Sequence, residues 1–233
     1  MIDLESWSLI VSSVSPDPAE APDRILELCV EHLDVSGAGM SVVDPDLATM
    51  YTCATDRISA KIEDLQWTLG EGPCVDAMKQ GAPVLVGDIE NDPHLIAQRW
   101  PTFLAEAARI GVRGVFSFPL QIGAIRLGVM DLYRLTPGPL SANTLAAALI
   151  AGEASSLALL DLRGSAGEVE GDLALPVEMQ VHQATGMVQV QLGVSAAEAL
   201  LRIRSRAYVD GRSLIEVATD VVHRRLRFSQ EDL

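Results

Sequence analysis

Seven arginines lie between positions 202 and 227, and they are the side chains of this sequence best suited to bind an anion. The same stretch holds three carboxylates, so its local net charge is +4. A guanidinium group is a planar fork of donors that binds phosphate bidentately and stacks on unpaired bases. These arginines therefore predict a surface for phosphate or nucleic acid; the alternative is a solvated helix face without a ligand.

The charge of the whole chain is distributed unevenly. Its 233 residues carry a formal net charge of −15. Residues 1–175 hold 10 basic and 25 acidic side chains, a net of −15, whereas residues 176–233 hold 7 of each and are neutral. Because nucleic-acid phosphates repel an acidic protein, this split indicates that any such binding belongs to the C-terminal part.

Other residues near the arginines could contribute to a nucleic-acid contact. Gly186 and Ala207 have small side chains, over which a backbone or a splayed base could approach; the alternative is tight helix packing. Tyr208 could stack on a base or belong to the core. The remaining candidates are polar or charged: Thr185, Arg204, Arg206, Arg212, Ser213 and Arg224.

The N-terminal part offers residues for a small-molecule pocket but no catalytic set. The candidate lining residues are Trp67, Cys74, Asp88 and His94, between a predicted sheet and an irregular middle segment. Cys74 follows a Gly-Glu-Gly-Pro turn and precedes a predicted helix, where a thiol can be activated; a buried, inert cysteine is the alternative. The acidic residues around Asp88 do not form a calcium loop, and we expect neither a metal nor a cofactor.

Cysteine usage and the amino terminus indicate a reducing compartment. The chain has three widely spaced cysteines and no Cys-x-x-Cys pair: Cys29, Cys53 and Cys74. Asp3 and Glu5 stand where a secretory signal needs basic residues. The apolar stretch 140–160 is interrupted by polar and small residues, which favours a core or dimer-interface helix over a membrane span. We therefore expect a cytoplasmic protein with no membrane contact.

The elements that position these residues follow from apolar periodicity and turn chemistry. The segment 57–69 is a weak helix or a loop. Around it we expect helices, two strands, a short strand, a hairpin and a long final helix: helices at 5–14, 23–34, 74–79, 103–109 and 141–162, and strands at 38–43, 49–55, 83–86, 115–120 and 125–133.

The C-terminal part is predicted to be helical throughout. Helices are expected at 177–192, 196–209 and 214–226. Capping boxes, in which Ser and Glu three residues apart satisfy the first turn, open the second helix at Ser195 and the third at Ser213. The segment 163–176 is rich in glycine and acidic residues and reads as a linker.

The N-terminal pattern resembles a GAF domain over roughly residues 20–165. The resemblance rests on the order of the elements and on four short stretches: Leu69-Gly-Glu-Gly-Pro-Cys74, Pro83-Val-Leu-Val-Gly-Asp88, Phe118-Pro-Leu120 and Leu127-Gly-Val129. It implies an antiparallel sheet flanked by helices and a role in sensing a signal or a small-molecule ligand. The motif by which some members bind cyclic nucleotides is not found here.

The C-terminal residues resemble the ANTAR domain, an RNA-binding module of transcription antitermination regulators. The matching residues occur in all three predicted helices: Ala184-Thr-Gly186, Ser195-x-x-Glu198-Ala199, Ile203-Arg204, Ala207, Leu214 and Val217-Ala218. The family usually has lysine where this chain has Thr185, so one phosphate-reaching charge is missing. The resemblance implies that Arg204 contacts RNA.

Together these patterns predict an α+β protein with a GAF-like domain at 1–162, a linker at 163–176 and an ANTAR module at 177–233. The predicted function is that of an RNA-binding antitermination regulator, not an enzyme, in which the GAF domain controls binding to paired stem-loops in leader transcripts. We also expect a homodimer. Two alternatives stay open: a protein–protein switch or dimerisation module that binds no RNA, and a redox enzyme of the GAF type.

Overall fold

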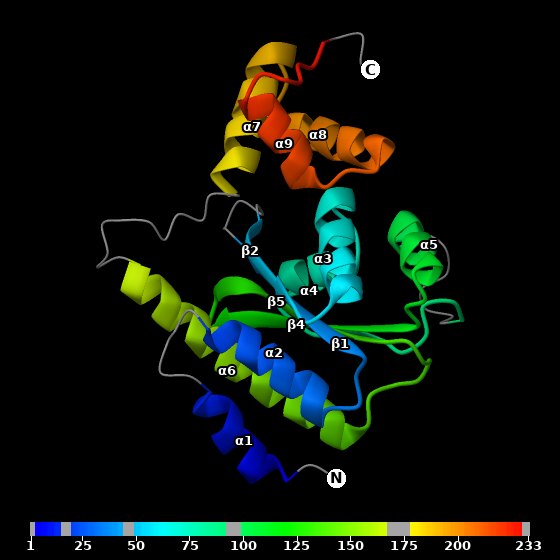
Figure 1. Cartoon of the computed structure of the whole chain (residues 1–233), viewed down its shortest axis with the longest axis vertical. Coiled ribbons are helices and arrows are strands. Elements are labelled where there is room, and N and C mark those ends of the chain that lie inside the picture. Colours follow the sequence, from blue (N-terminus) through cyan, green and yellow to red (C-terminus); the bar gives the residue numbers. More distant parts are fainter. Residues whose placement is uncertain (1–2, 15–19, 44–48, 92–98, 167–177, 230–233) are drawn as a thin grey trace.

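A five-stranded sheet lies at the centre of the N-terminal part, with helices on both of its faces (Figure 1). Three C-terminal helices form a second cluster with its own apolar core. The predicted α+β fold, an antiparallel sheet flanked by helices followed by a three-helix module, is confirmed. The computed structural model describes residues 3–14, 20–43, 49–91, 99–166 and 178–229.

All neighbouring strands of the sheet are antiparallel, in the order β2-β1-β5-β4-β3. The hairpin predicted at Gly123-Ala124 joins β4 to β5, and Gly123 adopts a φ of +60°, a value that glycine reaches without strain. The strand bounds are Gly37–Val43 for β1, Thr49–Ala54 for β2, Val84–Val86 for β3, Gly114–Ile122 for β4 and Ile125–Arg134 for β5.

The two faces of the sheet carry different residues because successive side chains of a strand point to opposite sides. Phe116, Phe118 and Met130 pack toward the layer of helices α1, α2 and α6, the last of which spans Ala142–Ala166. Ser117 and Asp131 lie opposite each other on β4 and β5 and face the other layer. The helix bounds are Leu4–Ser12 for α1, Ala21–His32 for α2, Pro73–Gln80 for α4 and Pro101–Arg109 for α5.

The segment 57–69, for which the sequence predicted either a weak helix or a loop, is a complete helix, α3 (Arg57–Leu69). Asp56 caps it by accepting hydrogen bonds from two backbone N–H groups of the first turn, at 2.7 and 2.8 Å. Gly70 ends it with a φ of +68°. The helix buries Glu63 and Gln66 against the sheet, and these polar side chains interrupt the apolar periodicity by which a helix is recognised.

The last helix of the N-terminal part, α6 (Ala142–Ala166), runs past its expected end at 162, so residues 163–166 of the expected linker are helical. The rest of that segment lies outside the described residues. One window of α6, Ala142–Asp161, is long and apolar enough to cross a membrane, but 44% of it is buried inside the protein. It packs against the sheet, α1 and α2, as a core helix does.

The C-terminal helices begin where their caps predict. Ser213 and Glu216 form a complete capping box at the third helix. At the second helix Ser195 accepts a hydrogen bond from the backbone N–H of Glu198 at 3.2 Å, while the Glu198 carboxylate pairs with Arg202. The bounds are Glu178–Leu192 for α7, Ala196–Asp210 for α8 and Leu214–Val222 for α9.

Candidate functional site

The core of the C-terminal module is made of small and branched apolar residues from all three helices. Ala207 is completely buried in this core, together with Ala184 and Ile203. A residue without exposed surface cannot touch a ligand directly. Of the two interpretations of Ala207, the structure therefore has the tight helix packing.

Most of the C-terminal arginines already have an acidic partner on the module surface. The ion pairs are Arg202–Glu198 at 3.1 Å, and Arg206–Asp210, Arg212–Asp220 and Arg225–Asp220, each at 2.7 Å. Exposed pairs of this kind contribute about 0–1 kcal/mol of stability. They cost little to break, so these guanidinium groups remain available to a phosphate.

An open groove between α7 and the segment that follows α9 is lined by Gly186, Arg224 and Arg227, with glutamine and apolar neighbours. Its volume is about 510 Å³. Arg224 has a φ of +59°, which ends α9 four positions before the expected residue 226 and turns the chain back toward α7. The backbone N–H of Phe228 then donates to the Gln191 side chain at 2.9 Å.

Among the described residues that line this groove, two are arginines and none is acidic. Neither Arg224 nor Arg227 forms an ion pair with another described residue, and a side chain added at Gly186 would meet nothing within 4 Å. Gly186 and Arg224 were predicted from the sequence, whereas Arg227 was not singled out. Only the reversal of the chain at Arg224 brings it beside α7.

Three further predicted residues lie at the turn between α8 and α9. Tyr208 is 47% exposed, so it is not part of the core and its ring is free to stack. Ser213 is occupied as the N-cap of α9, and Arg212 pairs with Asp220. None of the three is among the residues that line the groove.

Arg204 has a different environment from the other arginines, because it lies where the module contacts the N-terminal domain. Helix α3 contacts both α8 and α9, and α7 contacts β2. The guanidinium group lies over Gly70: a Cβ at that position would be 2.7 Å from Nη1. Its Nε is buried without a hydrogen-bond partner in the described structure, and burial lowers the pKa of Arg204.

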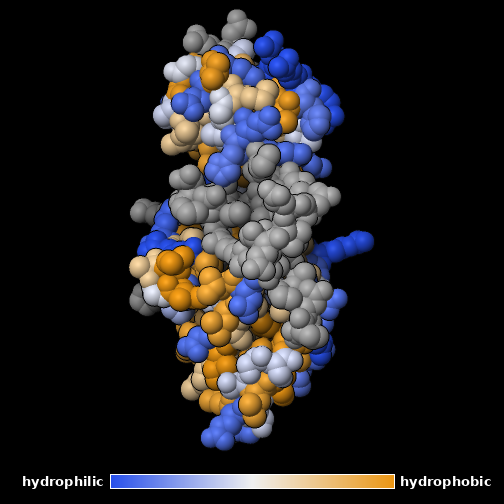
Figure 2. Space-filling view, turned by 90° about the vertical axis from the view of Figure 1, so that its left-hand side faces the viewer, coloured by the Kyte–Doolittle hydropathy of each residue, from blue (hydrophilic) through white to orange (hydrophobic). Residues whose placement is uncertain are grey.

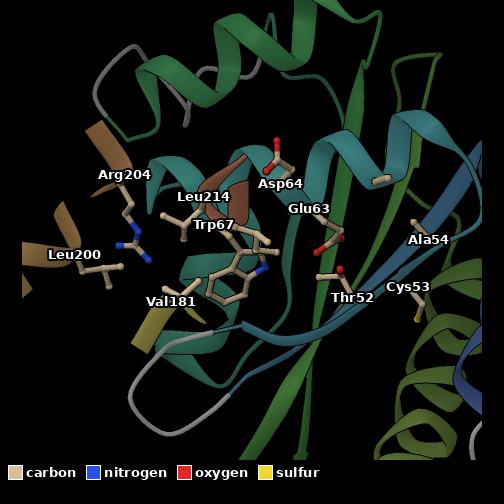
Figure 3. A pocket seen from close by; sticks show the side chains of 12 residues that line it. Thr52, Cys53, Ala54, Glu63, Asp64, Trp67, Val181, Leu200, Arg204 and Leu214 are labelled. Atoms are coloured by element: carbon tan, nitrogen blue, oxygen red, sulfur yellow. The ribbon is translucent and has the colours of Figure 1, made fainter. Parts of the chain in front are cut away.

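Two adjoining cavities flank Arg204 at this contact. The first, about 160 Å³, includes Glu63 and Asp64 of α3. Figure 3 shows Arg204 reaching from α8 into the space in front of Trp67, with Val181 and Leu200 beside it. The second, about 550 Å³, is lined by Arg204 and Thr185 from the module and by Lys79 from α4. The Thr185 hydroxyl donates to the Val181 carbonyl at 2.7 Å, so it stays on its own helix.

The structure does not bring the predicted ligand-pocket residues into one site. Trp67 lines both cavities, and its indole Nε1 donates to Ser41 at 2.7 Å. Asp88 lies beyond β3 and pairs with Arg113 at 3.0 Å. Cys74 is completely buried, and His94 lies outside the described residues.

The N-terminal domain contains a buried acidic cluster that the sequence did not indicate. Ligand atoms of Glu63, Cys74 and Asp131 lie within 4.8 Å of one another. The Gln66 amide donates to Asp131 at 2.6 Å, and the Ser41 hydroxyl donates to Glu63. One oxygen of each carboxyl has no partner in the described structure. Such a set could share a proton, and its thiol and carboxylates could also hold a divalent cation such as zinc.

The Gly-Glu-Gly-Pro turn before Cys74 has a structural role. The Glu71 side chain accepts hydrogen bonds from the backbone N–H groups of Thr102 and Phe103, both at 2.8 Å, and so caps the start of α5. Burial raises the pKa of the Cys74 thiol well above its usual value and that of Cys29 to about 12. Because the thiolate is the reactive form, these environments suit inert cysteines.

Comparison with known families and structures agrees with this architecture. A family model described as GAF domain matches residues 15–159, and one described as ANTAR domain matches residues 174–222. Comparison with curated protein sequences gave no match.

Solved structures that resemble the chain share its N-terminal fold. The GAF domain of a phosphoenolpyruvate-protein phosphotransferase from Coxiella burnetii is 13% identical with a TM-score of 0.52, covering 70% of this chain and 94% of that one. A domain of a two-component sensor histidine kinase protein from Sinorhizobium meliloti is 16% identical with a TM-score of 0.51, covering 67% and 100%. At these identities the likeness shows the fold alone.

A third solved structure has the same fold. The protein fRMsr of Staphylococcus aureus, in its reduced form, is 12% identical with a TM-score of 0.50, covering 68% of this chain and 96% of that one. The fold is thus shared by proteins with different names, and a shared fold does not decide activity. The two family matches, which together span most of the chain, do decide the domain content: this chain belongs to the GAF domain family and carries a C-terminal ANTAR domain.

Proposed function

We propose that this protein is a transcription antitermination regulator that binds stem-loop RNA through its ANTAR module under control of the GAF domain. The observation that carries the proposal is the groove of Gly186, Arg224 and Arg227, an open cationic surface without acidic partners in the described structure. It lies on a module whose family match is independent of the charge argument. Because RNA is the partner, we place the protein in the cytoplasm.

The contact between the two domains supplies the control. Arg204, the residue that the family pattern assigns to RNA, lies against Gly70 of the GAF domain and faces the interdomain cavities. A guanidinium group in this position cannot reach a phosphate on an external RNA. We infer that the arrangement seen here is the RNA-silent state, and that separation of the domains completes the RNA surface. The proposed domain limits are 1–162 and 177–233.

Replacing both Arg224 and Arg227 with glutamine is expected to weaken RNA binding by about tenfold or more and to reduce the salt slope of the affinity by roughly 1–2. Each lost cation removes one phosphate contact and the counterion release that goes with it. Gel shifts with structured leader RNA at several salt concentrations measure both effects. Arg109→Gln, an exposed arginine of α5, is the control. Equal affinity and slope in the two proteins would contradict the groove as the RNA surface.

We further propose that α6 forms a homodimer contact. Leu149, Leu157 and Leu160 are 44%, 59% and 47% exposed, and helical spacing places them on one side of α6. Figure 2 shows the side of the molecule at which α6 ends. Hydrophobic residues gather there over the lower half of the molecule. A second copy of the chain would cover this face and bring two ANTAR modules to paired stem-loops.

Leu157→Glu is therefore expected to convert a dimer to a monomer at micromolar concentration, because two buried carboxylates would meet across the contact. Sedimentation velocity measures the change. Leu9→Glu, at a leucine of α1 that is still more exposed (71%), is the control and should leave the dimer intact. A wild-type protein that sediments as a monomer would contradict this proposal.

A further inference from the structure

The larger interdomain cavity differs from the rest of this acidic protein in the charge of its walls. Its charged lining residues are Lys79 from the GAF domain and Arg204 from the ANTAR module, and the His182 imidazole of the module lines it as well. No carboxylate is among the described residues that line it. None of these three side chains forms an ion pair with a described residue. Because the chain as a whole has a net charge of −15, Lys79 and Arg204 give the cavity a local potential opposite to that of its surroundings.

The buried guanidinium group of Arg204 lacks a hydrogen-bond acceptor among the described residues. A guanidinium group has five N–H donors, and burying a charged donor without an acceptor is costly. The Nε of Arg204 is buried and makes no hydrogen bond in the described structure, while the adjacent C-terminal end of α3 supplies only the partial negative charge of a helix terminus. An anion in the cavity would satisfy this group.

The remaining walls and the size of the cavity fit a small organic molecule better than a bare ion. Trp67 and Met78 line it from the GAF domain, and Leu200 lines it from α8. Its volume of about 550 Å³ falls in the range of small-molecule sites, and an apolar lining with a few convergent polar groups is typical of them. The first turn of α8 also lines the cavity, through Ala196 and Ala197, and a helix N-terminus favours negative charge.

We propose that this cavity binds a small organic anion, a phosphate or carboxylate on an apolar or aromatic body, which bridges the GAF domain and the ANTAR module. The charged group lies between Lys79, His182 and Arg204, and the body lies against Trp67 and Leu200. Since the ligand contacts both domains, it stabilises their docked arrangement. The regulatory consequence, which rests on the proposed function, is that the ligand and RNA compete for Arg204. The anion is then the signal that keeps the regulator from binding RNA.

Isothermal titration calorimetry of the full chain, without RNA, tests the site. The probes are phenyl phosphate and benzoate, which represent the two anion types, and benzamide, the neutral counterpart of benzoate. We expect binding of at least one anion and none of benzamide. Arg204→Gln and, separately, Lys79→Gln should weaken the anion by about tenfold or more, since each removes a charge-assisted contact. Arg109→Gln, an exposed arginine of α5 outside the cavity lining, should bind like wild type.

Failure of both anions to bind, or equal binding of benzamide, would overturn the site. So would unchanged anion affinity in Lys79→Gln, whose exposed side chain can be replaced without disturbing the core. The regulatory consequence is tested separately by gel shift: the bound probe should raise the dissociation constant for RNA in wild type. Anion binding without this effect would overturn the competition but not the site, whereas absence of RNA binding in every variant would overturn the proposed function.

Discussion

Leu200→Ala is expected to weaken the docking of the ANTAR module on the GAF domain and to tighten RNA binding by about fivefold. Leu200 lines both interdomain cavities beside Trp67, and the smaller cavity also contains Asp64. Alanine would remove the apolar contact that Leu200 makes across the interface, and such a loss typically costs about 1 kcal/mol or more. Undocking would expose Arg204, and the extra phosphate contact would strengthen the complex with RNA.

The matched control is Leu201→Ala, because Leu201 is the next residue of α8 but is 58% exposed and lines neither cavity. Gel shifts with leader RNA and small-angle X-ray scattering should be measured on both variants. We expect a larger radius of gyration and tighter RNA binding for Leu200→Ala alone. If both variants bind RNA as wild type does, the docked arrangement does not restrain the module.

Glu63→Gln is expected to stabilise the protein at alkaline pH by about 1–3 kcal/mol and to have a smaller effect in mild acid. Glu63 and Asp131 are 2% and 3% exposed. Burial raises the pKa of Glu63 well above its usual value, and the Asp131 carboxylate raises it further; burial also raises the pKa of Asp131. One proton shared between the two carboxyls would satisfy the two oxygens that lack a partner.

The direction of the pH dependence follows from these shifts. In the unfolded chain Glu63 titrates near about 4.3, below its pKa in the folded protein, so folding favours the protonated form. This contribution to stability is complete below the unfolded value and is lost as the pH rises through the folded value. Glutamine imitates the protonated acid at every pH, which is why the gain should grow with pH.

Urea unfolding of wild type and Glu63→Gln at about pH 5 and about pH 8 measures the effect. Glu27→Gln is the control, since Glu27 is exposed on α2 and pairs with Arg24; it should change the free energy of unfolding by at most about 0.5 kcal/mol at either pH. A Glu63→Gln protein that is less stable at alkaline pH would contradict the shared proton. If a chelator destabilised wild type to the same extent, the cluster would instead hold a cation.

The two parts of the chain were predictable from the sequence to different depths. Capping boxes and arginine spacing are local features, so the start of α8 at Ser195 and of α9 at Ser213 could be placed correctly. Helix α3 could not, because its identity as a helix depends on burying Glu63 and Gln66 against the sheet, a long-range interaction. The buried cluster was invisible for the same reason: its members come from α3, α4 and β5.

The C-terminal arginines also show what local sequence predicts and what only tertiary contacts determine. Their type, number and spacing determined that the C-terminal part is a cationic module, because these properties depend on composition and local helix geometry. Only the tertiary structure determined the environment of each arginine. Arg224 and Arg227 line the same groove because the chain reverses after α9. Arg204 lies at the domain contact because α8 packs on α3 beside Gly70. These residues are far apart in the chain, so no local pattern predicts the contact.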